Sequence, residues 1–240
     1  MRASLSRGLR LFLNPARSLP AMPWSARRSG WSRPRLVTLA VLLFGLWLFG
    51  VGEAGLINAR LGNTPWTVLA QGVSEHAPLD IGGATILISV VVLLGWIPLR
   101  QQPGIGTVAN VVVIGLSLDA MRRVLPEPES LVGRSVEVGL AILAIGAASA
   151  LYLTANLGPG PRDGWMTGLH RRFGFPIASV RAAIELSVLL IGLALGGTVG
   201  VATVAFALLV GYCLASTVRL FELAFARRGG GAVTAPRAEP

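Results

Sequence analysis

Six apolar runs divide this chain of 240 residues, and each is close to the length that crosses a lipid bilayer as a helix. The runs cover residues 36–58, 81–99, 104–121, 135–156, 177–195 and 198–218. The last two runs together hold about 42 residues, too many for one span, so a tight turn is expected at Gly196 and Gly197. A helix satisfies its own backbone hydrogen bonds in lipid. The sequence therefore predicts an all-α integral membrane protein with about six transmembrane helices.

The composition favours this class and argues against several others. Charged residues make up 13% of the chain and hydrophobic residues 53%, whereas soluble domains carry about 25% charged residues. The single cysteine, Cys213, excludes a disulfide framework, and His76 and His170 have no ligand-rich neighbourhood. We therefore expect no metal site and no cofactor. The P-loop, HExxH, GxSxG and CxxC patterns are absent from the sequence, so we expect that the chain is not an enzyme.

All 21 basic residues are arginines, and their distribution predicts the topology. With the N-terminus inside, the count is about 16 arginines in cytoplasmic segments and four outside, leaving aside Arg181 within a run. We expect a membrane protein with both termini in the cytoplasm. The arginines lie almost wholly in the loops and tails outside the apolar runs, as membrane topology explains. We therefore expect no nucleic-acid partner. The lipid bilayer is the expected partner, and a second copy of the chain or another membrane protein is left open.

The ends of the chain differ from the membrane part, which covers residues 36–125 and 131–220. Residues 1–35 are basic and contain no acid, and residues 221–240 are expected to form a second cytoplasmic tail. Leu5, Leu9 and Phe12 recur at helical spacing, as in a short interfacial helix. A disordered tail is the alternative, and a transit peptide has a similar composition.

The membrane part contains an internal repeat. Residues 59–119 align with residues 155–215 at a constant offset of 96, and 17 of these 61 positions are identical. Glycine and proline coincide at this offset, which apolar composition alone does not explain. Each copy holds three spans, an odd number, so the second copy enters the membrane from the opposite side. The sequence therefore predicts two inverted three-helix repeats, an architecture common in secondary transporters.

Segments broken by glycine and proline follow spans one and four, at Leu61–Gly72 and Leu157–Gly168. In inverted-repeat transporters such segments bind substrate near the middle of the membrane, although ordinary loops carry the same residues. The candidate backbone-turn residues are Gly62, Pro65, Gly158, Gly160, Pro161 and Gly164.

The densest polar cluster lies in the second copy. Arg162 and Asp163 are in the broken segment, and Arg181 and Glu185 share one helix face at a spacing of four. Glu185 is expected about 12 Å deep, near the middle of the membrane, where a lone charge costs a few kcal/mol. A structural ion pair with Arg181 and a substrate or proton site both fit. The other binding candidates are Asn156, Tyr152, Thr67, Ser89 and Asn110.

The first copy does not repeat these charges. Trp66, Thr67, Thr85 and Ser89 occupy the positions equivalent to Arg162, Asp163, Arg181 and Glu185. Two other acids are expected in surface pairs, Glu53 with Arg60 and Asp119 with Arg122 and Arg123. Gly139, Gly146 and Ala150 form a stripe of small residues that could face a partner.

Three motifs resemble a known family. They are the run Leu157–Met166 containing GPRDG, the pair Arg181 and Glu185 with Val180 and Ile184, and the run Leu195–Thr203. Together they resemble the YczE-type bacterial membrane proteins of the YczE/YyaS/YitT group, with Trp165 standing where leucine is expected. The resemblance covers residues 36–220. It implies a multi-spanning bacterial inner-membrane protein without a settled activity, and it supplies no substrate.

Two functions follow as hypotheses. The repeat and the deep acid favour a small transporter or permease-like protein with a polar site near the middle of the membrane. The small size and the lack of a large soluble domain favour a non-transporting accessory or scaffold protein that docks another membrane or enzyme subunit. A proton-coupled transporter needs a titratable group that both sides can reach, and Glu185 is the deep candidate in the sequence.

Overall fold

The computed structural model describes residues 20–26 and 34–226, and within them every regular element is a helix. The helices are α3 (Leu36–Ala59), α4 (Pro65–Ser74), α5 (Ile81–Leu94), α6 (Trp96–Leu99), α7 (Ile105–Val124), α8 (Leu131–Thr154), α9 (Pro161–Phe173), α10 (Ile177–Ala194) and α11 (Val201–Ala226). The predicted all-α membrane class is confirmed. Five stretches are long and apolar enough to cross a membrane: α3, α5 with α6, α7, α8 and α11. Because α10 is not among these five, six spans remain a prediction.

The helices of the two copies begin at equivalent residues. The pairs α4 and α9, α5 and α10, and α7 and α11 each start 96 residues apart. Backbone φ angles repeat in the same way: positive values pair Arg60 with Asn156, Gly62 with Gly158 and Arg100 with Gly196. The alignment seen in the sequence therefore extends to the local backbone, including conformations that most residues avoid.

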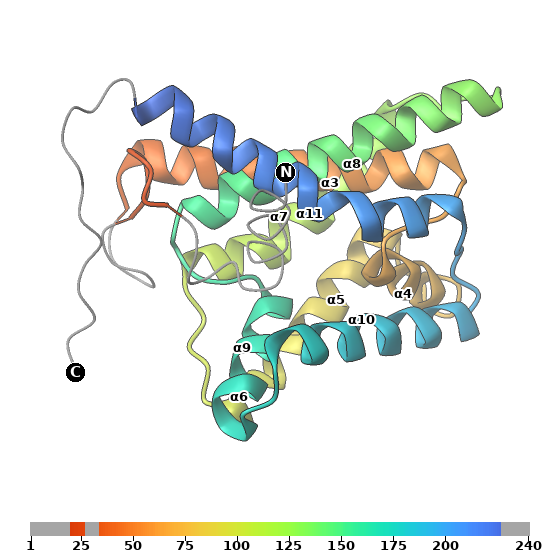
Figure 1. Cartoon of the computed structure of the whole chain (residues 1–240). Helices are drawn as coiled ribbons and strands as arrows, with labels where there is room; N and C mark the ends of the chain where they lie inside the picture. Colours follow the sequence, from red (N-terminus) through yellow and green to blue (C-terminus); the bar gives the residue numbers. More distant parts are fainter. Residues whose placement is uncertain (1–19, 27–33, 227–240) are drawn as a thin grey trace.

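The copies are packed into each other (Figure 1). Helices α3 and α8 pack along one another, α3 also packs on α7, and α8 also packs on α11. The short helix of each copy crosses to the other: α4 packs on α10, and α9 packs on α5 and α6. In Figure 1, α10 and α9 lie on the side of the molecule opposite α8. Neither copy therefore has its present packing without the other.

Equivalent glycines allow the third helix of each copy to approach the first. A Cβ on Gly50 of α3 would lie 1.8 Å from Ser117 Oγ of α7, and one on Gly146 of α8 would lie 2.3 Å from Cys213 Cβ of α11. Gly146 and Ala150 are thus buried inside the molecule, and the expectation that they face a partner is wrong. Of that stripe, Gly139 has open space around it.

The copies differ in how their second and third helices meet. Helix α5 packs along α7, and the Asp119 carboxylate accepts hydrogen bonds from the N–H groups of Gly82 (2.7 Å) and Gly83 (3.2 Å) at the start of α5. The expected pairing of Asp119 with arginines is therefore wrong: it caps a helix, and Arg123 pairs with Asp80 at 2.7 Å. Alanine (Ala215) stands at the equivalent position of α11, and α10 does not pack along α11.

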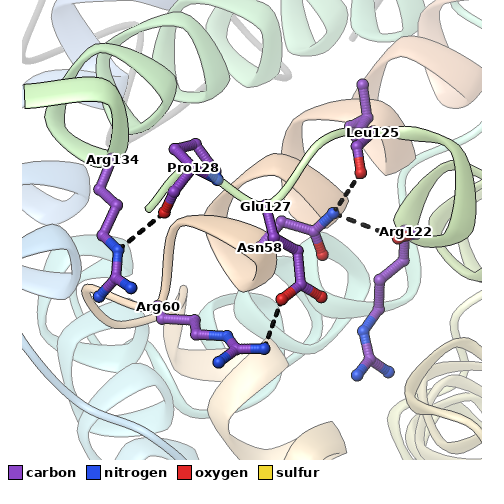
Figure 2. Close-up of polar contacts among 7 residues, drawn as sticks. All are labelled: Asn58, Arg60, Arg122, Leu125, Glu127, Pro128 and Arg134. Carbon is purple, nitrogen blue, oxygen red and sulfur yellow. Dashed lines mark hydrogen bonds and ion pairs between the residues drawn. The ribbon is translucent and has the colours of Figure 1, made fainter. Parts of the chain in front are cut away.

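Polar groups hold the connection between the copies (Figure 2). Asn58 Nδ2 donates to the carbonyl oxygens of Arg122 (3.2 Å) and Leu125 (3.1 Å), which ties the end of α3 to the end of α7. Arg60 is paired with Glu127 in this connection, so the expected pair of Arg60 with Glu53 is wrong. Arg60 has a φ of 54°, and this left-handed turn carries its side chain away from α3.

Part of the basic N-terminal segment is packed on the helices. Trp24 is buried, its indole N–H donates to Thr154 Oγ1 at 3.0 Å, and its ring makes edge contacts with Phe221 and Phe225. Ala26 N donates to the carbonyl of Ala155 at 3.0 Å. Residues 20–26 therefore dock on the ends of α8 and α11. The expected interfacial helix around Leu5, Leu9 and Phe12 lies outside the described residues.

Candidate functional site

Two equivalent turns lead into the short helices α4 and α9. Gly62 has a φ of 112° and Gly158 a φ of 121°, values that glycine adopts without strain. Pro65 and Pro161 then occupy the first turns of the short helices, where their missing N–H groups cost nothing. The predicted turns at Gly62 and Gly158 are present. Gly164, in contrast, lies inside α9 against the Trp96 indole, so its placement in a turn was wrong.

Each turn is bound to the third helix of the other copy. Gly106 N at the start of α7 donates to the carbonyl of Leu157 at 2.8 Å, and Ala202 N at the start of α11 donates to the carbonyl of Leu61 at 2.9 Å. These two hydrogen bonds are equivalent at the offset of 96. They satisfy N–H groups that a helix start leaves open, and they fix both broken segments at the boundary between the copies.

A cavity of about 110 Å³ lies where the broken segments meet the long helices. Its wall includes residues of α3, α7, α8, α9, α10 and α11, together with the start of α4. The polar and aromatic part of the wall consists of Phe49, Thr64, Trp66, Asn110, Ser149, Tyr152, Arg162, Asp163, Arg181, Glu185 and Phe206. The cavity therefore brings together six of the nine binding candidates that the sequence indicates. Whether they bind a ligand remains a prediction.

Arg162 lies at the boundary between the copies. Its guanidinium carbon is 4.6 Å from the centre of the Trp66 ring, close enough for a cation–π interaction. Trp66 is the residue of the first copy equivalent to Arg162. The guanidinium is also close enough to Glu53, Tyr152, Glu185 and Asp163 for electrostatic interaction. One cation is thus shared by acids from both copies.

The pair of Arg181 and Glu185 is present on α10, with Nε and Oε1 3.1 Å apart. The two side chains are 20% and 26% exposed, and both line the cavity. The helix spacing alone predicted this contact. Because neither side chain is fully buried, its contribution to stability as an isolated pair is expected to be small.

Asp163 and Tyr152 connect the start of α9 to α8. Asp163 lies in the first turn of α9, with its Oδ2 3.2 Å from where a Cβ on Gly160 would lie, and both Asp163 and Tyr152 line the cavity. A carboxylate is favoured at this place because the first N–H groups of a helix carry a partial positive charge. Asn110 lies close to the same turn, with its Nδ2 3.5 Å from where a Cβ on Gly160 would lie.

Three sequence candidates lie away from the wall of the cavity. Ser89 is buried on α5 and does not line it. Asn156 turns outward, where its Nδ2 donates to the carbonyl of Ala26 at 3.0 Å and holds the N-terminal segment. Thr67 is directed to Glu53. Asn156 was chosen because it lies near the end of a span, and Ser89 because it is the repeat equivalent of Glu185. Neither criterion specifies which face of a helix is turned toward the cavity.

Glu53 is the site residue that the sequence reasoning missed. It is 2% exposed on α3, and its carboxylate accepts hydrogen bonds from Thr64 Oγ1 (3.2 and 3.3 Å to the two oxygens) and from Thr67 Oγ1. The sequence reasoning missed Glu53 because Arg162 is far from it in sequence, whereas Arg60 is only seven residues away and is the partner that the sequence suggests. The signal that could have found it is its place in the last third of an apolar run, ahead of two threonines at the next helix start.

Metal binding finds no support in the part of the chain that is described, where no group of three or more histidine, cysteine, aspartate or glutamate residues is placed to hold an ion. The wall instead carries guanidinium groups, carboxylates, a phenol and an amide beside aromatic rings. These groups can hold a small polar molecule through charge and hydrogen bonds.

Comparisons with known proteins assign a family. Residues 36–218 match the family of unknown function DUF6198, and the chain therefore belongs to this family. A protein of Haemophilus influenzae described as uncharacterized is 43% identical over 191 residues, which cover 80% of this chain and 87% of that protein. The uncharacterized membrane protein YczE of Bacillus subtilis is 31% identical over 172 residues, or 71% of this chain and 77% of that protein. The resemblance to YczE-type proteins is confirmed. No solved structure matches the chain.

Proposed function

We propose that this member of the DUF6198 family is a small transporter or permease-like protein of the bacterial cytoplasmic membrane, and that the cavity beside Arg162 binds its solute. The observation that carries the proposal is the charged cavity itself. Guanidinium groups and carboxylates are costly inside a membrane protein, and in membrane segments they commonly mark substrate or ion pathways. Here they come from a Gly/Pro-broken segment and from the helix that follows it.

The relation between the copies supports an inverted repeat. Counting α10 as a span gives three spans to each copy, so the second copy runs through the membrane in the opposite direction. With the arginine-rich ends inside, α4 then approaches the cavity from the outer side and α9 from the inner side. Their equivalent turns, Gly62 and Gly158, are bound to the other copy in the same way.

The difference between the copies fits alternating access. In the first copy α5 packs along α7, whereas in the second α10 stands apart from α11. Residues of both α10 and α11 line the cavity, at Glu185 and Phe206 for example, so the cavity occupies the space between them. In inverted-repeat transporters, two copies in different arrangements give access from one side at a time. Under the proposed topology, the near ends of α7, α8 and α10 put this access on the cytoplasmic side.

Sided cysteine labelling tests the proposal. In a Cys213→Ser background, Ser149→Cys and Asn110→Cys are expected to react with a small charged thiol reagent from the cytoplasmic face of oriented vesicles. Leu208→Cys is the matched control, since Leu208 is 65% exposed on α11 and faces lipid, where a charged reagent does not go. If both cavity cysteines stay unmodified from both faces, the chain offers no path for a solute and the proposal fails.

The same variants can identify the solute class. Panels of small carboxylates, amines, amino acids and inorganic phosphate are tested for slowing the labelling of Ser149→Cys. Protection that is lost when Arg162→Gln is added assigns the protecting class to the cavity. Stoichiometric co-purification of another membrane or enzyme subunit, together with unreactive cavity cysteines, would instead favour an accessory or scaffold protein.

A further inference from the structure

We propose that Glu53 is a proton-binding site in the first copy, the counterpart of Asp163 in the second, and that it shares the guanidinium of Arg162 with the cavity. This inference rests on the proposed transport function and adds the coupling ion. The identification comes from the hydrogen bonds of Glu53, from an exchange of residues between the copies, and from the count of charges around Arg162.

The contacts of Glu53 are those of an acid that can be neutral. Within residues 34–226, the hydroxyl groups of Thr64 and Thr67 are the hydrogen-bond donors to its carboxylate, and no guanidinium donates to it. Thr64 is the N-cap of α4, so the carboxylate lies beside the start of that helix. A buried carboxylate with only neutral donors is expensive when charged, and protonation removes this cost.

The equivalent residues in the second copy exchange the acid and the hydroxyl. Position 53 corresponds to Ser149, and Thr67 corresponds to Asp163. Each copy therefore places one carboxylate and one hydroxyl between its first helix and the first turn of its short helix. In the first copy the acid is on the long helix, and in the second it is on the short helix.

The two acid positions differ in access. Ser149 and Asp163 both line the cavity, whereas Glu53 and Thr67 do not. The structure thus holds the site of the second copy open and the site of the first copy closed. If the copies interchange their arrangements during transport, as inverted repeats do, the Glu53 site opens when the Asp163 site closes. Glu53 would then exchange its proton with water on the outer side.

Arg162 links the two acids. Its guanidinium lies over Trp66 and interacts electrostatically with Glu53, Glu185 and Asp163. Together with Arg181, two cations face three carboxylates, which leaves one negative charge in excess. Inside a membrane such a charge costs a few kcal/mol, so one carboxylate is expected to take up a proton. Glu53 is the one of the three that lies outside the cavity wall and has only hydroxyl donors.

Other titratable and hydroxyl groups also lie on the helices that surround Glu53. Tyr152 of α8 lines the cavity with Asp163, and Glu137 of α8 lies beside α3 near Gly55, with its Oε1 3.7 Å from where a Cβ on Gly55 would lie. Helix α4 contributes the two threonine hydroxyls.

Proton uptake converts the Glu53 carboxylate to a carboxylic acid with a proton taken from water, and release returns that proton to water. An anionic solute that pairs with Arg162 in the cavity would favour uptake, because it would offset the positive charge near Glu53.

Infrared difference spectroscopy of the full-length protein in lipid, with pH as the variable, tests the proposal without a solute. The wild-type protein is expected to show a protonated-carboxyl C=O band that already grows in the pH range where exposed carboxylates stay ionised. Glu53→Gln should remove this band, while the surface control Glu127→Gln should keep it. Glu185→Gln removes one of the three carboxylates, so its band should appear only at a lower pH. Thr67→Val retains the acid and removes a donor, so the band should move and not vanish. This second variant keeps the test valid if Glu53→Gln does not fold.

A difference spectrum of Glu53→Gln that overlays the wild-type spectrum at every pH overturns the proposal, as does an unmoved band in Thr67→Val. These outcomes are independent of the cavity labelling. Reactive cavity cysteines with an unchanged spectrum in Glu53→Gln would leave a transporter that has no proton site at Glu53. Unreactive cavity cysteines with a band lost in Glu53→Gln would leave a protonated acid and overturn its place in a transport cycle.

Discussion

The guanidinium of Arg162 lies 4.6 Å above the Trp66 ring, and these two residues occupy the same position in the two copies of the repeat. A residue that touches its own equivalent lies where the copies adjoin. The contact therefore marks the boundary between the copies, where Arg162 lines the cavity together with Asp163 and Glu185.

Removing the ring should destabilise this boundary. Trp66→Leu is expected to lower the thermal midpoint in detergent, since it loses a largely desolvated cation–π contact of about 1–2 kcal/mol and leaves a void beside Arg162. Trp66→Phe should retain part of the contact, so its thermal midpoint should lie between those of the wild type and Trp66→Leu. Trp47→Leu serves as the control, because Trp47 is 40% exposed on the outer face of α3. Equal midpoints for Trp66→Leu and Trp47→Leu would contradict the role of the ring.

The two turn glycines should be equally intolerant of a side chain. Gly62→Ala puts a Cβ 2.4 Å from Gly200 N, and Gly158→Ala puts one 2.9 Å from Thr107 Oγ1, both at a positive φ. Each change is expected to cost more than about 1 kcal/mol of stability. Gly139→Ala in helix α8 meets open space and should be neutral or stabilising. Thermal unfolding of the three variants side by side checks the ranking.

Glu185→Gln should leave the fold nearly intact. The pair with Arg181 is partly exposed, and pairs of this kind contribute about 0–1 kcal/mol, so the expected change in thermal midpoint is small. Its effect should appear as weaker solute protection of Ser149→Cys. The alternative is a structural pair, for which Glu185→Gln would lower the midpoint strongly and the double variant Arg181→Leu/Glu185→Leu would restore it.

The six-span topology predicts a labelling pattern for loop cysteines. In a Cys213→Ser background, Pro78→Cys and Val199→Cys should react with an impermeant thiol reagent from outside intact cells, and Gln102→Cys should not. All three positions are exposed in the structure. The reverse pattern would contradict the arginine count that places both termini in the cytoplasm.

The docked N-terminal segment should depend on Trp24. Trp24→Ala removes a buried ring and the hydrogen bond to Thr154, so residues 20–26 are expected to undock and become more sensitive to protease. Thr154→Val, which removes the hydrogen-bond acceptor for the indole but keeps the ring, should have a smaller effect. Cleavage within residues 20–26 is measured in detergent by mass spectrometry. Equal cleavage rates in the wild type and Trp24→Ala would show that the ring does not hold the segment.

Several features could be predicted from residues alone because they depend on local rules. Apolar run length indicates a spanning helix, glycine and proline at one offset reveal the repeat, and a spacing of four places Arg181 and Glu185 in contact. Each of these rules involves residues close in sequence or a simple alignment. For this reason the long apolar helices, the turn at Gly158 and the polar residues of α9 and α10 were found without a structure, whereas the short helices α4 and α9 were not.

The sequence by itself thus determined a helical membrane protein with two related copies and a charged segment in the second. Only the tertiary structure decided which acids share a cation. Glu53 turns from the nearby Arg60 to two threonines, because Arg60 adopts a left-handed turn toward Glu127. Asp119 caps α5, and Ser89 lies off the cavity, because helix rotation and packing between the copies choose the face that each side chain presents. Those choices depend on contacts between residues far apart in the chain, which no local pattern encodes.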